Sequence, residues 1–377
     1  MRAVTYQGKY SVSVENVDYP AIQDSEDVII RVTSTAICGS DLHLYQGNFP
    51  LPIGYMIGHE PMGIVEETGQ NVTKVKKGDR VVIPFTVACG ECPYCQTHQE
   101  SQCDNANPHY DSGGYFGYSE KFGDYPGGQA EYLRVPYGNY TPFLVPEDCE
   151  LDDDALLFLS DVLPTAYWSV EHAGVKEGDT VVVLGCGPIG LMAQKFAWQK
   201  GAERVIAVDH VSYRLQHARK TNNTEVYNFE AYDDMGEELK ERTHGGADVV
   251  IDCVGMDGKK SPLEFIEQKL KLQGGTLGPI QIATKAVKKC GIVQITGVYG
   301  GLYNMFPLGP FFTRNITLKT GQAPARSYMD KLYHQVERGD IDPTNIITHH
   351  MPLNDAVHGY KMFNGKEDDC IKVVLQP

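Results

Sequence analysis

The segment that most constrains the fold is a short apolar run that leads directly into closely spaced glycines. Residues 181–184 have the length and β-branched content of a buried strand. Glycines in the pattern Gly-x-Gly-x-x-Gly follow, and a helix-compatible segment at 191–200 comes next. The motif residues are Gly185, Gly187, Pro188, Ile189 and Gly190. This order predicts a βαβ unit that binds the pyrophosphate of a dinucleotide at the helix N-terminus.

An acidic residue follows these glycines at the spacing that a dinucleotide site needs. Asp209 ends the next apolar run, 19 residues beyond Gly190, where a carboxylate hydrogen-bonds a ribose 2′-hydroxyl. Because this carboxylate would repel a 2′-phosphate, NAD is favoured over NADP. His210 and Arg214 lie near enough in sequence to weaken this preference without reversing it. The alternative is an ordinary glycine turn followed by a helix-capping or surface aspartate.

The pattern of the chain changes near residue 180, where short apolar strands begin to alternate with helical segments. Strands are predicted at 180–184, 204–208, 248–252 and 292–296, which indicates a parallel sheet covered on both faces. Before about residue 160 the sequence predicts a mostly β domain that opens with a strand at 1–7 and contains a long loop at 105–128. Residues 370–375 are predicted to form a strand that rejoins this first domain.

Composition excludes several classes of protein. The 377 residues suffice for two or three domains, and the 42% hydrophobic and 22% charged residues are typical of a soluble globular protein. A formal net charge of −16 argues against nucleic-acid and membrane-surface partners. No apolar run reaches the roughly 18 residues of a membrane-spanning helix. Because the first residues also lack the pattern of a secretory signal, we expect a cytoplasmic protein.

The ten cysteines include a cluster of four within 15 residues. Cys89, Cys92 and Cys95 are each separated by two residues, and Cys103 follows after seven. Four thiolates in so short a lobe can surround one tetrahedral ion, and an all-sulfur site suits a structural zinc ion. An iron–sulfur motif begins similarly, but its fourth cysteine follows after three residues and precedes proline, whereas Asp104 follows here. The spacing favours zinc over a cluster, and favours both over disulfides.

A second group of metal-binding side chains lies earlier in the chain. A lone cysteine is usually a small buried hydrophobe and a lone histidine is usually packed or solvated, so each member is ambiguous by itself. Together with a dinucleotide site, however, they predict an open metal site. The members are Cys38, Ser40, Asp41, His43, His59 and Glu60.

These motifs, in this order, resemble the zinc-dependent medium-chain alcohol dehydrogenases over nearly the whole chain. The segments 127–132 and 159–165 are most similar to the formaldehyde dehydrogenase-like branch, which includes glutathione-independent enzymes. The resemblance implies an α/β fold: a Rossmann doubly wound parallel sheet plus a mostly β GroES-like catalytic domain. It also implies a catalytic domain with a zinc lobe at 1–162, an NAD-binding domain at 163–320 and a return to the catalytic domain at 321–377.

The resemblance implies two zinc ions per chain, a structural one on the four clustered cysteines and a catalytic one on Cys38 and His59. Many members have a third zinc-binding cysteine four residues before a threonine, but this chain has Asp161 ahead of Thr165. Because a carboxylate can also bind zinc, we predict Asp161 as the third ligand. Glu60 is the rival, since polyol-dehydrogenase relatives use a glutamate there, and a helix-capping Asp161 is the remaining alternative. Thr165 is assigned to the cofactor-binding residues.

The family also moves a proton out of its closed site through a hydroxyl, the cofactor ribose and a histidine. Ser40 and His43 match the hydroxyl and the histidine, and Asp41 matches an acid that orients the imidazole of His59. Phe85 resembles a pocket-lining position, and its bulk predicts a small substrate.

The predicted function is therefore a zinc-dependent transfer of hydride between a small alcohol or aldehyde and NAD. Alternatives are a redox-neutral aldehyde dismutase with tightly bound NAD, a polyol dehydrogenase, and a non-enzymatic NAD-binding or zinc-binding module. A homodimer or homotetramer is expected. The long segment 255–291 predicts either a cover over the cofactor or a subunit interface. Both interpretations depend on its apolar residues, which are Leu263, Phe265, Ile266, Leu270 and Leu272.

Overall fold

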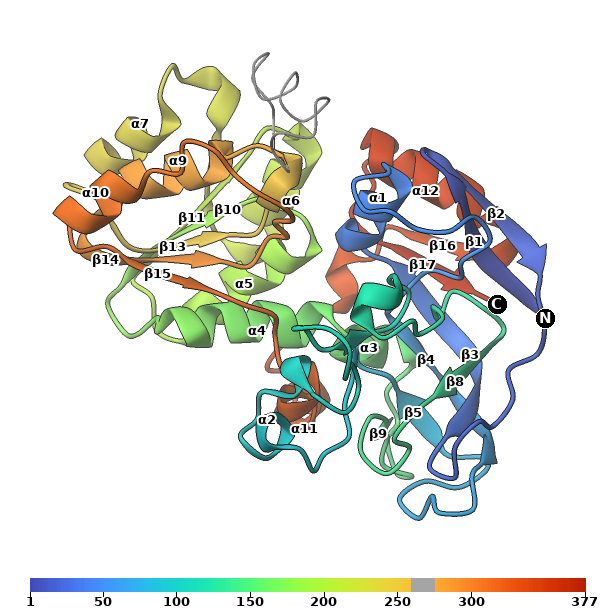
Figure 1. Ribbon diagram of the computed structural model, residues 1–377. Helices are drawn as coiled ribbons and strands as arrows, with labels where there is room; N and C mark the ends of the chain where they lie inside the picture. The colour runs from blue at the N-terminus through green and yellow to red at the C-terminus, as the bar shows by residue number, and fades with distance from the viewer. Residues whose placement is uncertain (259–274) are drawn as a thin grey trace. The chain divides into compact units, whose positions relative to one another are not determined.

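The computed structural model describes residues 1–258 and 275–377, and its chain divides into two compact units (Figure 1). The first unit comprises Met1–Pro164 and Ala323–Pro377, and the second comprises Thr165–Gln322. Both chain ends thus lie in one unit. The apolar residues of the proposed cover or interface, 263–272, lie outside the described residues. The division at 162/163 and 320/321 into catalytic and cofactor-binding domains stays a prediction.

The first unit is built on a seven-stranded sheet in the order β16-β17-β3-β4-β5-β9, with β8 also paired to β3. Two further ladders, β1 with β2 and β6 with β7, complete its strands. The strands are β1 (Arg2–Gly8), β2 (Ser11–Asn16), β3 (Val28–Ile37), β4 (Pro61–Thr68), β5 (Arg80–Val82), β6 (Thr86–Val87), β7 (Gly114–Tyr115), β8 (Tyr132–Val135), β9 (Phe143–Leu144), β16 (His349–Pro352) and β17 (Val373–Gln376). The helices are α1 (Gly39–Tyr45), α2 (Pro93–Gln96), α3 (Asp153–Leu156), α11 (Ala325–Glu337) and α12 (Ala356–Gly365), and α4 (Val162–Ala173) continues into the second unit.

Three neighbouring strands of this sheet position the site described below. Strand β3 is ten residues long and almost wholly buried, and its end lies antiparallel to both neighbours. Thr35 of β3 pairs with Pro61, which opens β4, and Ile37 pairs with Val373, which opens β17. The residues just after β3 and just before β4 and β17 therefore lie side by side, at the same end of these three neighbouring strands. The predicted C-terminal strand thus pairs with β3 of the first unit.

The second unit has a six-stranded, all-parallel sheet in the order β12-β11-β10-β13-β14-β15. Numbered from β10, this is the order 3-2-1-4-5-6 of the doubly wound dinucleotide-binding fold. The strands are β10 (Thr180–Leu184), β11 (Arg204–Asp209), β12 (Glu225–Asn228), β13 (Ala247–Asp252), β14 (Val287–Ile295) and β15 (Thr317–Thr320). The helices are α5 (Pro188–Gln199), α6 (Ser212–Asn222), α7 (Met235–Arg242), α9 (Gly278–Ala286) and α10 (Leu308–Thr313).

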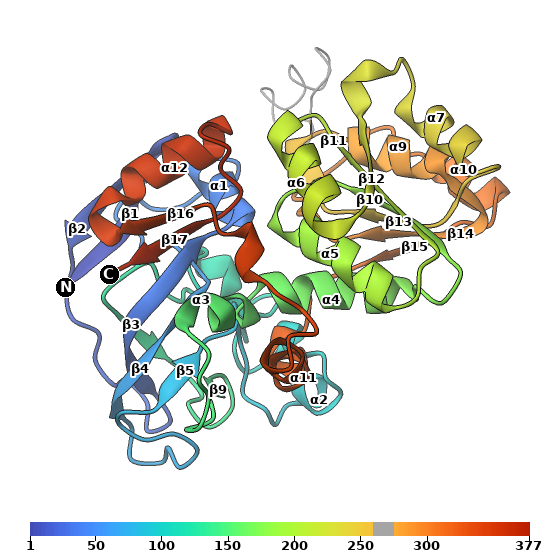
Figure 2. The same ribbon diagram turned by 180° about the vertical axis from the view of Figure 1, so that it is seen from behind.

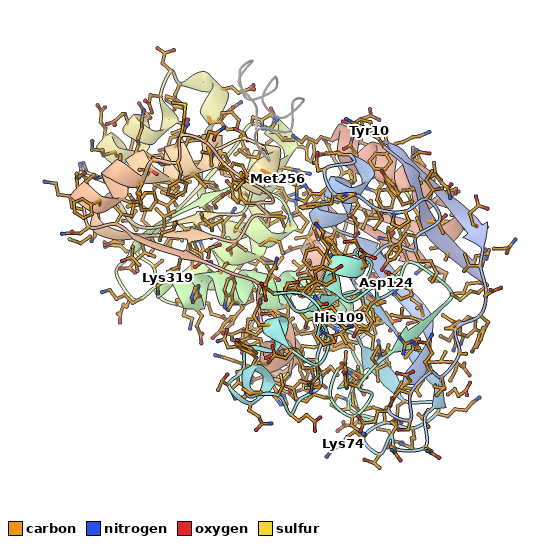
Figure 3. The ribbon with its side chains drawn as sticks, in the orientation of Figure 1. Tyr10, Lys74, His109, Asp124, Met256 and Lys319 are labelled. Atoms are coloured by element: carbon orange, nitrogen blue, oxygen red, sulfur yellow. The ribbon has the colours of Figure 1, made fainter. Side chains whose placement is uncertain are left out.

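Helices cover both faces of this sheet (Figures 1 and 2). On one face, apolar residues of α7, α9 and α10 form a core with the strands, including Leu239, Ile280 and Phe311. Helices α4, α5 and α6 cover the other face. There the Nζ atom of Lys319, labelled on β15 in Figure 3, donates a 2.6 Å hydrogen bond to the carbonyl of His172 in α4.

Two expectations about elements need correction. Strand β14 begins at Val287, five residues before the predicted start, because Ala247 pairs with Val287 and the ladder then shifts before Val249 pairs with Ile292. A chain interrupted in this way does not show the apolar run of a buried strand. The predicted loop at 105–128 also contains strand β7, which pairs with β6, and a 3-10 turn at Glu120–Phe122. In the described part of the chain, no helix is long and apolar enough to cross a membrane.

Candidate active site

Four side chains that can bind a metal meet at the edge formed by β3, β4 and β17. They are Cys38, His59, Glu60 and Asp161, all buried, and one ligand atom from each lies within 4.8 Å of the others. Cys38 is the N-cap of α1, directly after β3, and His59 and Glu60 directly precede β4. Asp161 directly precedes α4. The structure thus brings the predicted ligands Cys38, His59 and Asp161 together with the rival, Glu60.

The spacing of these atoms suits a tetrahedral ion. Oδ2 of Asp161 lies 3.4 Å from Sγ of Cys38 and 3.4 Å from Nε2 of His59. Ligands bonded at about 2.0–2.3 Å in a tetrahedron stand about 3.3–3.8 Å apart. One sulfur, one nitrogen and one carboxylate oxygen are a donor set that zinc accepts. The residues therefore fit a zinc ion with one position left for another ligand.

Glu60 has a different environment from Asp161. Its Oε1 accepts a 2.7 Å hydrogen bond from Nζ of Lys372, which directly precedes β17, and both side chains are fully buried. Its Oε2 is buried without a hydrogen-bond partner among the described residues. Burial raises the pKa of Glu60, although Lys372 acts in the opposite direction. The second oxygen of Glu60 thus remains available to a cation, while Oδ2 of Asp161 lies 3.4 Å from both Cys38 Sγ and His59 Nε2.

The imidazole of His59 lies between the cluster and a buried acid. Its Nδ1 is 3.0 Å from Oδ1 of Asp41, so Nε2 faces Asp161 and Ser40. Burial by itself would lower the pKa of His59, but the charges of Asp41 and Cys38 raise it well above the ordinary value. Burial, together with Glu60 and Asp161, raises the pKa of Cys38 to about 11. A cation at this cluster would favour the deprotonated thiol and carboxylates that burial otherwise disfavours.

Ser40 and His43 both lie on α1. The hydroxyl of Ser40 is 3.2 Å from Sγ of Cys38 and 3.2 Å from Nε2 of His59. His43 is buried one turn later, with its ring edge-on to Phe49 at 6.2 Å. Because residues three apart in a helix share a face, the structure places both predicted relay residues on one side of α1, and brings Ser40 into contact with the metal-binding cluster.

An aromatic wall lies beside His59, and sequence reasoning found only one of its members. Phe85, the predicted pocket residue, has its ring centroid 6.3 Å from that of His59. Tyr118 is closer, at 5.7 Å, and burial raises the pKa of its hydroxyl while the interaction with Ser40 acts in the opposite direction. Tyr118 lies in the 105–128 segment, where no spacing or periodicity marks an individual aromatic residue. Lys372 was also missed, although a lysine within the apolar run at 370–375 signals a buried partner.

The four clustered cysteines converge on a second point. The Sγ atoms of Cys89 and Cys95 are 3.9 Å apart, and those of Cys92 and Cys103 are 3.8 Å apart. Sulfurs bonded to zinc at about 2.3 Å in a tetrahedron are about 3.8 Å apart, whereas a disulfide would need about 2.05 Å. Backbone amides of Cys92 and Glu91 donate to Sγ of Cys89, and a hydrogen bond from Cys95 lowers the pKa of Cys103 to about 5. This geometry fits a closed structural zinc site.

In the second unit, the glycine motif connects β10 to α5. Gly185 has a φ of +94°, and a Cβ on Gly190 would lie 2.0 Å from the carbonyl oxygen of Gly185, so strand and helix can approach only without a side chain there. Gly187 is the N-cap of α5 and Pro188 opens the helix. The backbone groups at this helix N-terminus can accept a phosphate, so the residues fit a dinucleotide.

Asp209 ends β11 beside this motif. Its Oδ2 accepts a 2.7 Å hydrogen bond from the amide of Cys186, and its Oδ1 accepts from the amides of His210 and Val211 at 2.6 and 3.0 Å. Arg214 reaches the same turn, since a Cβ on Gly187 would lie 3.8 Å from its Nη1. Ile189 follows Pro188 in the first turn of α5. Thr165 lies on α4, an earlier element of the chain than the glycine turn between β10 and α5.

The comparisons with known proteins agree on one family. Residues 24–147 match the alcohol dehydrogenase GroES-like domain, and residues 188–269 match the zinc-binding dehydrogenase domain. The zinc-type alcohol dehydrogenase-like protein AdhB of Bacillus subtilis is 59% identical over 378 residues, covering 100% of both chains. A glutathione-independent formaldehyde dehydrogenase of Bacillus subtilis is 33% identical, covering 100% of this chain and 97% of that one. The solved alcohol dehydrogenase TADH from Thermus sp. ATN1 is 33% identical, with a TM-score of 0.85 over 100% of this chain and 99% of that chain.

Proposed function

Because the chain belongs to the zinc-dependent medium-chain alcohol dehydrogenase family, we propose that it transfers hydride between a small alcohol or aldehyde and NAD. The observation that carries the proposal is the buried Cys38–His59–Asp161 cluster, whose sulfur, nitrogen and oxygen atoms have tetrahedral spacing. A doubly wound sheet with a glycine-rich phosphate turn in the same chain supplies a place for the hydride acceptor.

Each residue of the cluster has a part in this proposal. Cys38, His59 and Asp161 hold a catalytic zinc ion, which when bound would act as a Lewis acid and lower the pKa of an alcohol. Ser40, 3.2 Å from His59 Nε2, takes the proton of the substrate hydroxyl, and His43 passes it outward. Asp41 orients the ring of His59. The aromatic side chains of Phe85 and Tyr118 exclude water and limit the size of the substrate.

NAD is the proposed cofactor, with Gly185, Gly187 and Gly190 at the pyrophosphate and Asp209 at the ribose. The carboxylate of Asp209 already accepts three backbone N–H groups, so it is fixed in a place where it would repel a 2′-phosphate. Arg214 can contact the pyrophosphate, and Ile189 and Thr165 are also proposed to bind the cofactor. Asp209→Ala should lower kcat/KM with NAD at least tenfold relative to NADP, measured by steady-state rates with each cofactor; an unchanged ratio would argue against this role.

The zinc assignment is tested by metal analysis of the purified protein. Two zinc ions per chain are expected, one on the four clustered cysteines. Asp161→Ala should lose one zinc ion and the activity, while the surface variant Asp148→Ala should keep both. If Asp161→Ala retained two ions, Glu60 would be the better candidate for the third ligand, and the assignment of Asp161 would be wrong.

The activity is tested by following NADH absorbance with C1 to C6 alcohols, polyols and aldehydes, with and without added NAD and glutathione. Oxidation of a small alcohol or aldehyde that needs added NAD but not glutathione is expected. Activity on paired aldehydes without added cofactor would instead indicate a dismutase. If no compound of these classes reacted, hydride transfer as the function would be refuted.

A homo-oligomer is part of the proposal. Strand β15 lies at the edge of the second sheet, and large apolar side chains near it are strongly exposed: Leu302 by 82%, Met305 by 83%, Leu308 by 68% and Phe312 by 83%. Such a patch beside an unpaired strand edge supports association with a second copy. Light scattering of the wild type and of Phe312→Asp would measure this association with a second copy. A cytoplasmic location is also proposed, on the support that none of the ten cysteines is in a disulfide.

A further inference from the structure

A chain of buried polar side chains runs from the C-terminal helix to the metal-binding cluster. It begins at Tyr360 on α12 and continues through Gln129 to Asp41 and the ring of His59. Tyr360, Gln129 and Asp41 are each fully buried, and His59 is 2% exposed. Polar groups buried this completely stabilise a single arrangement only when their hydrogen bonds are made, so the connections between them decide whether they define a structure.

The orientation of the Gln129 amide is determined by its neighbours. Its Nε2 donates to the carbonyl of Ala36 at 3.0 Å and to Oδ2 of Asp41 at 3.1 Å, and its Oε1 accepts a 2.8 Å hydrogen bond from the hydroxyl of Tyr360. Burial raises the pKa of Tyr360 well above its ordinary value, so the hydroxyl keeps its proton and donates it to Oε1. An inverted amide would place an NH₂ group against that hydroxyl and an oxygen against two acceptors.

Asp41 is therefore held on one oxygen and faces His59 with the other. Oδ2 accepts from the amide of Cys38 at 3.0 Å as well as from Gln129. Oδ1 forms a 3.0 Å ion-pair contact with Nδ1 of His59, and neither atom has a hydrogen-bond partner among the described residues. A shift of the Asp41 carboxylate would thus turn the imidazole or leave its Nδ1 unpaired. The same carboxylate contacts the backbone of Cys38, so two of the proposed zinc ligands depend on its position.

The backbone makes room for this arrangement at Gly58. A Cβ on Gly58 would lie 2.3 Å from Cγ of Gln129, and the φ of +95° at Gly58 is one that other residues rarely adopt. The glycine before His59 therefore allows the Gln129 side chain to pass directly beneath the metal-binding cluster. A glutamine that merely filled space would not need both this gap and three hydrogen bonds.

We propose that Gln129 and Tyr360 are positioning residues of the catalytic metal site, which act through Asp41 to fix the imidazole of His59 and the backbone of Cys38. The proposal rests on the proposed zinc site of Cys38, His59 and Asp161. It assigns the C-terminal segment an indirect role in metal binding, through Tyr360, which is 231 positions from Gln129 along the chain. Loss of outer hydrogen bonds of this kind typically weakens metal binding or activity by about 10- to 100-fold.

The test measures zinc release from the full-length, zinc-loaded protein to a colorimetric chelator. Tyr360→Phe removes one hydroxyl, and Gln129→Met keeps the side-chain length but removes all three hydrogen bonds. We expect the catalytic ion to leave about tenfold faster in Tyr360→Phe, and faster still in Gln129→Met, while the ion of the cysteine lobe leaves at the wild-type rate. The double variant should behave like Gln129→Met alone, since both residues act along one chain of contacts.

Cobalt substitution and a matched control separate positioning from a loss of folding. The visible spectrum of Co²⁺ at the catalytic site should shift in both variants and stay unchanged in Tyr333→Phe, which removes another buried tyrosine hydroxyl, one bonded to Glu337 instead. Wild-type release rates and spectra in both variants would overturn the proposal. If the wild type itself held only the ion of the cysteine lobe, the proposed function would fail instead, so the two failures are distinguishable.

Discussion

The ammonium of Lys372 lies 2.7 Å from Oε1 of Glu60, although the two residues are 312 positions apart and neither side chain is exposed. Lys372 directly precedes β17 and Glu60 directly precedes β4, and both strands are neighbours of β3. The ammonium also stands 5.8 Å from the ring centroid of Phe158. Lys372 therefore balances one of the acids in the cluster and leaves Cys38, His59 and Asp161 to a metal ion.

Lys372→Met should strongly destabilise the protein, because it leaves the carboxylate of Glu60 buried without its partner. Breaking one side of a buried ion pair typically costs about 3–5 kcal/mol. Urea unfolding at pH 7 measures the effect. The double variant Lys372→Met/Glu60→Gln should recover most of the loss, because no unpaired charge then remains. A single variant as stable as wild type would show that the pair does not hold this edge of the sheet.

Tyr118→Phe should lower kcat/KM for the preferred substrate about fivefold, which corresponds to the roughly 1 kcal/mol of one hydrogen bond. The ring that packs beside His59 is kept, but the hydroxyl whose pKa Ser40 lowers is lost. Tyr125→Phe is the matched control from the same segment, since its hydroxyl donates instead to the carbonyl of Ala106 at 2.8 Å. Equal kcat/KM values in the two variants would remove Tyr118 from the substrate site.

Sequence analysis could predict those parts of the site whose residues lie close together in the sequence. The glycine turn occupies six residues, and the four-cysteine lobe occupies 15, so their spacing alone indicates a geometry. The sheet order of the second unit follows from the same βαβ pattern. The start of β14 was missed because a shift in the ladder, with Cys290 at a φ of +60°, interrupts its apolar pattern.

The remaining residues could not be predicted because tertiary contacts bring them together. Tyr360 and Gln129 meet only when α12 packs against the rest of the first unit. Lys372 reaches Glu60 only because β17 pairs with β3. Nothing in the neighbouring sequence of Gln129 indicates that its amide contacts Asp41. Asp161 could be proposed from a resemblance, yet its competition with Glu60 depends on which carboxylate Lys372 already holds.

His43→Gln should reduce turnover most below about pH 7, where hydroxide is too scarce to replace a base in proton transfer. His43 is buried on α1 one turn beyond Ser40, the position that the proposed relay requires. Small buffer bases such as imidazole should partly restore the rate, because they can enter the pathway that the histidine vacates. Turnover against pH, at several buffer concentrations, measures this; a variant with the wild-type rate at every pH would exclude the relay.

His217 should make the second unit less stable as the pH falls below neutrality. It lies half-buried on α6, and its Nε2 is buried without a hydrogen-bond partner among the described residues. Burial lowers its pKa below the ordinary value of 6.5, and the charges of Lys195 and Lys220 add to this effect. Between 6.5 and the lower folded pKa, the unfolded chain binds a proton that the folded chain does not, so acid favours unfolding.

The corresponding experiment compares urea unfolding of wild type and His217→Gln from pH 7.5 to pH 5. The wild type should lose more unfolding free energy over this range, because the variant no longer has the group that takes up a proton on unfolding. Lys220→Gln, which removes one neighbouring charge, should weaken the pH dependence in the same direction but by less. Parallel curves for wild type and His217→Gln would mean that burial does not depress the pKa of this histidine.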